Sequence, residues 1–308
     1  MSRSLKAHLL LILTTLVWGA SFVVIKNALR DITPLLFNAI RMSVAAVTLL
    51  LVFWKDLRGM GRKVVGSGVL IGICLWAGNE LQTSGLKYTA ASKSAFLTGL
   101  AVVLVPAFLG LFWRRPIGRW SACGVVLALA GLYLLTIPAT ANGSPLAAVN
   151  RGDLMTIAAA VIFTFHIIFM GHAAQWHSWR QITVLQSVTA GVLNWIAVPV
   201  LERPTVAWSA PVVVGILLTG FFSLAAAFSV QAWAQQFIPA THTALIFSLE
   251  PVFASLTSFL VLGERLGVRG LFGAGMILAG VLLSEEGGAS ESMGVAPDHA
   301  AVPVSGGK

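Results

Sequence analysis

The sequence predicts an all-helical (all-α) integral membrane protein of ten transmembrane helices, arranged as two five-helix repeats of opposite orientation. Three observations predict it: a composition that is 57% hydrophobic and only 10% charged, apolar segments of spanning length almost end to end, and an internal repeat. A soluble domain carries about 25% charged residues, so this chain could not cover its apolar surface in water. Its mean hydropathy of +0.88 indicates that the bilayer is its solvent.

Ten apolar segments are each long enough to cross a bilayer, since a spanning helix needs ~20 residues. Short connectors between them favour antiparallel neighbours. The first segment follows Arg3 and Lys6 but has no clear small-residue cleavage site, which indicates an uncleaved helix rather than a signal peptide. We expect the transmembrane helices at 7–29, 34–54, 64–86, 91–113, 117–137, 152–174, 179–200, 209–236, 240–262 and 267–284.

An internal repeat divides these segments five and five. Residues 88–135 align without a gap on 237–284, and glycines coincide in both copies: Gly118 with Gly267, Gly124 with Gly273 and Gly131 with Gly280. Because each repeat has an odd number of spans, the second copy is inverted relative to the first. We therefore expect a first repeat at 1–137, a linker rich in Pro, Gly, Ser and Asn at 138–151, a second repeat at 152–284, and a disordered tail at 285–308.

The net charge of +9 lies in loops between apolar segments, which indicates charge that sets orientation rather than a nucleic-acid partner. The Lys and Arg residues in the loops of the second half weakly favour the opposite orientation, but the first helices usually determine the orientation of the whole chain. We expect both termini in the cytoplasm and the protein in the plasma (inner) membrane. The first-half bases that this orientation places inside are Arg3, Lys6, Lys55, Arg58, Arg62, Lys63, Arg114, Arg115 and Arg119.

Ionisable side chains inside predicted spans are costly and by default indicate function. Four are present: Arg41, Glu80, Lys93 and Glu250. We expect Arg41, Glu80 and Lys93 in the outer third of the membrane, as ion pairs or as a gate. For Lys93 a structural ion cluster or snorkelling to the interface is favoured, whereas for the other two the structural and the gating interpretations stand level.

Glu250 lies near the middle of the ninth span, where an isolated charge costs about 3 kcal/mol. Pro251 follows it and can kink the helix, and Pro106 is expected to break the fourth span at nearly the corresponding place. Interrupted helices at matching positions of two halves indicate a transporter's substrate site. We expect Glu250 to face a cavity and to exchange a proton or a substrate amine; the alternative is a protonated carboxyl that only holds helices together.

Uncharged polar residues at mid-span are expected to line the same cavity. Trp18 and Ser21 share one helix face, Asn79 and Gln82 lie about one turn apart, and Gln231 occupies the repeat position of Gln82. The expected substrate-binding set is Trp18, Ser21, Asn79, Gln82, Gln231, Trp233 and Glu250. Two other polar residues are expected to join helices instead, His166 and Asn194. The glycine-rich fifth and tenth spans are predicted packing or dimerisation surfaces.

Motifs in both halves resemble a known family. They are Trp18-Gly19-Ala20-Ser21-Phe22, the segment from Leu86-Lys87-Tyr88-Thr89 to Leu100, Leu249-Glu250-Pro251-Val252-Phe253, and Gly263-Glu264-Arg265. Together they are similar to the EamA branch of the drug/metabolite transporter superfamily, over nearly the whole chain to about residue 284. The resemblance implies a ten-helix inverted-repeat fold and transport, often export, of amino acids or other small metabolites. One departure is Arg114-Arg115, where the second copy has Gly263-Glu264.

The spans and the inverted repeat predict a multi-pass membrane transporter that works by alternating access, and the resemblance implies export of amino acids or related small zwitterions. The alternatives are an exporter of cationic drug-like compounds and an intramembrane binding or channel protein. An enzyme is not expected, because Ser21 lacks a His partner and His172 and His177 lack a companion carboxylate. We expect no cofactor and no metal. The expected partners are a small-molecule substrate and the lipid bilayer, with a proton as candidate coupling ion and a homodimer as candidate assembly.

Overall fold

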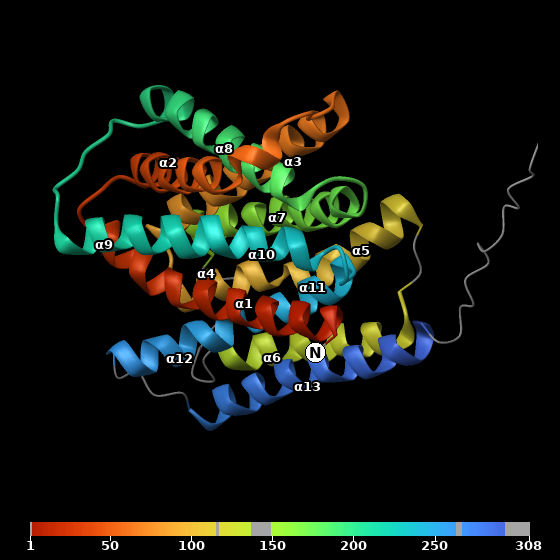
Figure 1. Cartoon of the computed structure of the whole chain (residues 1–308). Helices are drawn as coiled ribbons and strands as arrows, with labels where there is room; N and C mark the ends of the chain where they lie inside the picture. Colours follow the sequence, from red (N-terminus) through yellow and green to blue (C-terminus); the bar gives the residue numbers. More distant parts are fainter. Residues whose placement is uncertain (1, 115–116, 137–148, 263–266, 293–308) are drawn as a thin grey trace, which may run out of the picture.

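The structure is a computed structural model that describes residues 2–114, 117–136, 149–262 and 267–292. The described chain is all-helical, with one isolated antiparallel bridge between Ile32 and Val206, and its helices lie side by side in one bundle (Figure 1). In chain order they are α1 (Arg3–Ala28), α2 (Pro34–Phe53), η1 (Trp54–Leu57), α3 (Arg62–Leu86), α4 (Ala91–Gly99), α5 (Ala101–Trp113), α6 (Arg119–Thr136), α7 (Arg151–Trp176), α8 (Trp179–Leu201), α9 (Ala210–Leu218), η2 (Thr219–Ala226), α10 (Ala227–Ala234), α11 (Ala240–Phe247), α12 (Glu250–Leu262) and α13 (Val268–Ser292).

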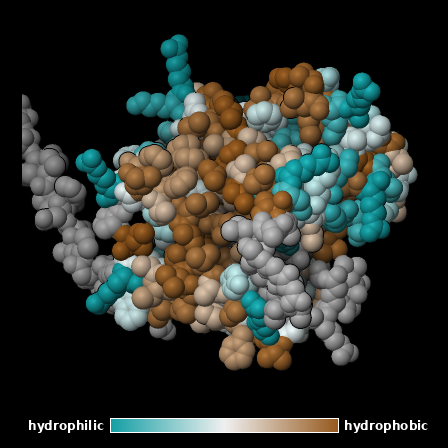
Figure 2. Space-filling model, turned by 180° about the vertical axis from the view of Figure 1, so that it is seen from behind, coloured by the Kyte–Doolittle hydropathy of each residue, from teal (hydrophilic) through white to brown (hydrophobic). Residues whose placement is uncertain are grey.

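The chain is a multi-pass membrane protein. Hydrophobic side chains form a broad band across the middle of the molecule, and hydrophilic ones gather toward its two ends (Figure 2). Within the described residues, seven helical segments are long and apolar enough to cross a bilayer, and two shorter apolar helices accompany them. The seven are Arg3–Ala28, Pro34–Leu57, Arg62–Leu86, Lys93–Trp113, Arg151–Trp176, Trp179–Leu201 and Ala210–Ala234; the shorter two are Arg119–Leu135 and Val268–Ser284.

Each predicted span contains helix, but the fourth and the ninth are interrupted. The fourth breaks at Leu100, between α4 and α5, and the ninth breaks between Phe247 and Glu250. Pro251 explains the second break, since it has no N–H to bond the carbonyl one turn earlier. The expectation that Pro106 breaks the fourth span is wrong, because that proline lies inside α5. The break falls instead after Gly99, where low helix propensity favours an end.

Other boundaries differ from prediction in instructive places. Helix α13 continues to Ser292, so the predicted disorder of 285–292 is wrong. Once a helix has formed, each added residue gains one hydrogen bond without a new nucleation cost, so a helix can continue into a segment that is not apolar. The rest of that tail, 293–308, and most of the predicted linker lie outside the described residues. The eighth predicted span forms one continuous segment, but its middle eight residues form the π-helix η2.

Helices of the first half of the sequence pack against helices of the second half. Helix α1 packs against α10 and α12, α3 against α7 and α8, α2 against α8 and η2, and α6 against α13. The last contact is a close one. A Cβ at Gly131 would lie 2.5 Å from the carbonyl oxygen of Gly273, and one at Gly124 would lie 2.6 Å from that of Gly280. The four glycines therefore serve intramolecular helix packing, one of the two roles predicted for them.

The loops at 29–34 and 202–209 are joined by backbone hydrogen bonds at one end of the bundle. The amide of Thr33 donates to the carbonyl of Thr205 at 3.0 Å, and that of Ala207 donates to Asp31 at 2.7 Å. The Glu202 carboxylate accepts hydrogen bonds from the first backbone amides of α2 at 3.1 and 3.2 Å. An anion at this position also interacts favourably with the helix dipole.

Candidate substrate-binding site

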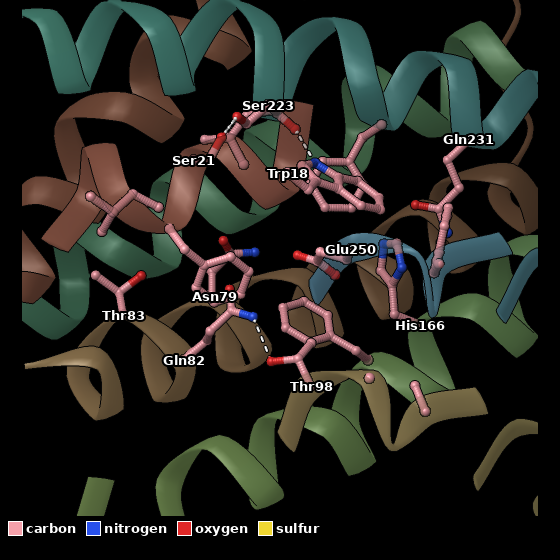
Figure 3. Close-up of a pocket in the computed structure, with 18 of the residues that line it drawn as sticks. Trp18, Ser21, Asn79, Gln82, Thr83, Thr98, His166, Ser223, Gln231 and Glu250 are labelled. Atoms are coloured by element: carbon pink, nitrogen blue, oxygen red, sulfur yellow. Dashed lines mark hydrogen bonds between the residues drawn. The ribbon is translucent and has the colours of Figure 1, made fainter. Parts of the chain in front are cut away.

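A cavity lies in the middle of the bundle, between helices from both halves of the sequence (Figure 3). Its volume of about 80 Å³ is room for several water molecules, since one needs 10–15 Å³. Six of the seven residues predicted to bind substrate line it: Trp18, Ser21, Asn79, Gln82, Gln231 and Glu250. The structure therefore brings the predicted set together, with one exception described below.

The roof of the cavity in Figure 3 is formed by α1 and η2. The indole nitrogen of Trp18 donates to the carbonyl of Ser223 at 2.8 Å, and the hydroxyls of Ser21 and Ser223 are 2.5 Å apart. In a π-helix the widened turn displaces backbone groups from their usual partners, and such turns are frequent at functional sites. Here the π-turn presents a carbonyl and a hydroxyl to α1, which fixes the orientation of Trp18.

Glu250 faces the cavity from the first turn of α12 (Figure 3). Its carboxylate makes no hydrogen bond or ion pair with any described residue, although only 8% of the residue is exposed. Gly19 of α1 allows this placement, because a Cβ there would lie 2.7 Å from the carbonyl oxygen of Glu250. A buried charge without a protein partner is costly, so this carboxylate is arranged for a proton, water or ligand.

Amides from both halves are placed around Glu250. The side-chain nitrogen of Gln82 donates to the Thr98 hydroxyl at 3.0 Å, and that of Gln231 donates to Gln235 at 3.1 Å. The side-chain oxygen of Gln231 is buried and has no partner among the described residues. Orphaned buried acceptors cost about 1–3 kcal/mol, so this oxygen is a second group in the cavity with unused bonding capacity.

Trp233 is the exception, since it does not line the cavity. It packs in the core beside Phe237, with ring centroids 5.2 Å apart, and the Lys6 ammonium lies 5.8 Å from its ring. Two residues along a helix is a rotation of about 200°, so Trp233 faces away from the side that Gln231 occupies. Placing Trp233 in the site was therefore wrong.

His166 joins two helices and also lines the cavity. Its Nε2 is 2.9 Å from the side-chain oxygen of Gln186 on α8, which joins two helices as predicted. It also lines the cavity (Figure 3). Asn194 bonds the carbonyl of Ala190 in its own helix, and no bond from it to another helix is present within the described chain.

Arg41 lines the cavity and is held by uncharged groups. Its Nε donates to the side-chain oxygen of Asn38 at 2.8 Å, and its Nη2 donates to Asn79 at 2.9 Å and to Thr83 at 3.1 Å. Asn38 in turn donates to Glu80 at 2.8 Å. The predicted pairing of Arg41 with Glu80 thus runs through Asn38, and the Nη1 of Arg41 has no hydrogen-bond partner in the described chain.

Lys93 forms an ion pair with Asp153, at 2.7 Å. Asp153 also accepts from the hydroxyl of Thr89 at 2.7 Å and from the amide of Asn150 at 2.9 Å, which completes a capping box for α7. The pair joins helix α4 to helix α7. The ion pair supports the ion-cluster interpretation of Lys93. Sequence reasoning missed its partner, although the Asn150-x-x-Asp153 spacing is a capping signal.

Comparison with known proteins identifies the family. A profile of the EamA-like transporter family matches residues 5–137 and 150–285. The chain belongs to the EamA-like transporter family. Relatives agree over most of their lengths. An uncharacterized transporter of Archaeoglobus fulgidus is 32% identical over 91% of this chain and 86% of its own. An S-adenosylmethionine/S-adenosylhomocysteine transporter of Chlamydia trachomatis is 26% identical over 90% of this chain and 88% of its own.

A solved structure shares the fold. One crystal structure matches with a TM-score of 0.74 at 16% identity, covering 92% of this chain and 97% of that chain. Family and relatives together identify this EamA-like protein as a multi-pass membrane transporter of small molecules. The relatives' names are consistent with the expectation that it is not an enzyme.

Proposed function

We propose that this EamA-like protein is a carrier that exports amino acids or related small zwitterions by alternating access, with the cavity around Glu250 as its binding site. The observation that carries the proposal is the Glu250 carboxylate, which faces the cavity without a partner among the described residues. A carboxylate in this setting favours a ligand ammonium, since hydrogen bonds to charged groups contribute about 1.5–3 kcal/mol each.

The aromatic lining supports a positively charged ligand group. The Trp18 ring lies 5.0 Å from that of Phe228 and 4.9 Å from that of Phe247, measured between ring centroids, and all three side chains line the cavity. Aromatic faces attract cations within about 6 Å. The relative named as an S-adenosylmethionine/S-adenosylhomocysteine transporter supports the same class, because both compounds are amino-acid derivatives with an ammonium group.

Arg41 supports a zwitterion over a simple cation. It lines the same cavity as Glu250, and its Nη1 is left without a partner in the described chain once Asn38, Asn79 and Thr83 are satisfied. A guanidinium is the group best suited to a ligand carboxylate. The cavity thus offers one acid and one base, which matches the two charges of an amino acid.

The inverted repeat remains part of the proposal, with repeats at 1–137 and 152–284. Two findings support it. Exchanging the halves turns the α1–α10 contact into the α3–α7 contact and leaves α2–α8 and α6–α13 unchanged. The breaks of the fourth and ninth spans also coincide in the repeat alignment, since Leu100 pairs with Leu249. Helices broken at matching positions commonly form the substrate site of such carriers.

Lys93, Arg41 and Glu80 are proposed to act in gating. The Lys93–Asp153 pair joins the first half to the second, and close to it a Cβ at Gly85 would lie 2.7 Å from the carbonyl oxygen of Gly152. In alternating access the two halves must separate at one end at a time, so these contacts would have to open on that side.

Orientation is proposed from loop charge, with both termini in the cytoplasm and the protein in the plasma membrane. The test is labelling of single cysteines in intact cells with an impermeant reagent, after Cys74 and Cys123 are replaced by Ser. Arg203→Cys should be labelled and Ser178→Cys protected. The reverse pattern would overturn the proposed orientation.

The function is tested in two steps. A thermal-shift screen of the purified protein against amino acids, their amine-only analogues and cationic drug-like compounds identifies a ligand. Counterflow of that ligand into proteoliposomes then compares wild type with Glu250→Gln. We expect its affinity to fall about 10–100-fold, as the loss of one charged hydrogen bond implies.

Asp56→Asn is the matched control. Asp56 does not line the cavity, and its carboxylate lies 2.9 Å from the guanidinium of Arg180. It should transport like wild type. Unchanged affinity in Glu250→Gln would refute the proposed site. Amine-only compounds that bind as tightly as amino acids would favour the second candidate, an exporter of cationic drug-like compounds, whose support is the aromatic lining. Large ohmic currents instead of saturable exchange would indicate a channel.

A further inference from the structure

A second hollow lies at one end of the bundle, apart from the central cavity. Its volume is about 530 Å³. It is bordered by the beginning of α2, the end of α3, the beginning of α7 and the end of α8. Because membrane-spanning helices begin and end at the membrane surface, the mouth of this cleft is expected at the level of lipid headgroups. Glu80, which lies six residues before the end of α3, is roughly 9 Å deeper. Its wall includes the exposed apolar side chain of Leu201.

The cleft contains charges of both signs that are not paired with one another. Glu80 and Glu202 supply carboxylates, and Lys87 and Arg151 supply cations. Within the described part of the chain, the ion pairs closer than 4 Å involve none of these four. Arg151 lies instead 3.6 Å from the centre of the Tyr88 ring, which holds its guanidinium at the cleft. Glu202 caps α2 and Glu80 accepts from Asn38, but neither carboxylate has a cation within 4 Å in the described chain. Two carboxylates and two cations bordering one cleft indicate a ligand that carries both signs.

Two buried polar atoms among the lining residues are also unused. They are the Oε2 of Glu80 and the indole nitrogen of Trp76, both without a partner among the described residues. The two residues are one turn apart on α3, so both occupy its cleft-facing side. One is an acceptor suited to an ammonium, and the other is a donor suited to an anionic oxygen. Buried polar groups in native proteins rarely go without a partner, which points to a missing occupant.

We propose that this cleft binds a second zwitterion, with its primary ammonium at Glu80 and Glu202 and its anionic group at Lys87 and Arg151. Two sources share this chemistry: a phospholipid with an ethanolamine headgroup, and a free zwitterionic metabolite. Glu80 is joined through Asn38 to Arg41, which lines the central cavity, so an occupant of the cleft touches a side chain linked to that site. The proposal does not depend on the proposed carrier function.

The test measures binding by native mass spectrometry of the purified protein with short-chain phosphatidylethanolamine. Short-chain phosphatidylcholine is the first comparison, because its quaternary ammonium cannot donate hydrogen bonds. Short-chain phosphatidylglycerol is the second, because it carries only the anion. We expect the ethanolamine lipid to bind at least about tenfold more tightly than either. Equal binding of all three lipids, with no binding of free phosphoethanolamine, would overturn the proposal.

Variants locate the site. The double variant Lys87→Gln/Arg151→Gln, at exposed positions, should lose about tenfold in affinity for the ethanolamine lipid. Arg180→Gln is the matched control, because Arg180 is an exposed base that pairs with Asp56. Glu250→Gln should also leave this binding intact, which separates it from the central site. Wild-type affinity in the double variant would contradict the assignment.

Free phosphoethanolamine separates the two sources. If it binds wild type about as tightly as the lipid and the double variant weakens it, the occupant is a free zwitterion. If the lipid binds and phosphoethanolamine does not, the occupant is a lipid headgroup. Both results support a zwitterion site. Binding of neither compound would refute it, and a parallel Glu80→Gln variant that binds like wild type would remove Glu80 from the site.

Discussion

Gly19→Ala tests how closely α1 must approach Glu250. The new Cβ would lie 2.7 Å from the carbonyl oxygen of Glu250 and 2.8 Å from the amide nitrogen of Ala254. Both are backbone atoms, so relief requires α1 and α12 to separate by roughly 0.5–1 Å. Overpacking of this kind costs about 1–3 kcal/mol, whereas alanine in a helix interior gains about 1 kcal/mol over glycine. The net loss of stability is therefore roughly 0–2 kcal/mol.

Gly275→Ala isolates the contact. A Cβ at Gly275, inside α13, would meet nothing within 4 Å, so this variant shows the helix-propensity gain alone. Thermal unfolding of both purified variants should place Gly19→Ala below Gly275→Ala by the 1–3 kcal/mol of the contact, which is a few degrees in Tm. Ligand affinity should fall only in Gly19→Ala, because Glu250 moves. Equal stability and affinity in the two variants would refute the reasoning.

Three further substitutions are expected to act through named contacts. Trp18→Phe removes the hydrogen bond to the Ser223 carbonyl and should cost about 0.5–1.5 kcal/mol and weaken ligand binding; unchanged affinity would remove the indole from the site. Lys93→Met leaves the buried Asp153 without its cation and should lower stability by about 1–3 kcal/mol, measured by thermal unfolding; a wild-type Tm would show that the pair contributes nothing. Gly273→Val should separate α6 from α13, since even a Cβ there lies 2.5 Å from a backbone nitrogen, and should prevent monodisperse purification; a well-behaved protein would contradict the packing.

Apolar segment length and buried polarity predicted most of the helices and most of the residues that line the central cavity, because both follow from the bilayer. A membrane-spanning helix must be apolar for about 20 residues, so its polar positions stand out, as Asn79 and Gln231 did. Glu250 was found for the same reason. Its carboxylate is costly at that depth, and the proline after it marks the helix break.

What sequence reasoning missed depended on geometry that composition does not encode. Trp233 was placed in the binding set as a polar residue inside a span, but helical rotation turns it to the face opposite Gln231. The π-helix at 219–226 has no sequence signal, so the hydrogen bond from Trp18 to the Ser223 carbonyl was unforeseen. Asn38 was not predicted to take part, because the sequence shows the two charges of Arg41 and Glu80 but not which uncharged amide lies between them.

A structure of the protein with its identified ligand would test the central claim most directly. The proposal predicts the ligand in the central cavity, with its ammonium about 2.7–3.2 Å from a Glu250 carboxylate oxygen and next to the Trp18 ring, and with its carboxylate toward Arg41 Nη1. A ligand bound elsewhere, or one in the cavity with its ammonium directed away from Glu250, would contradict it.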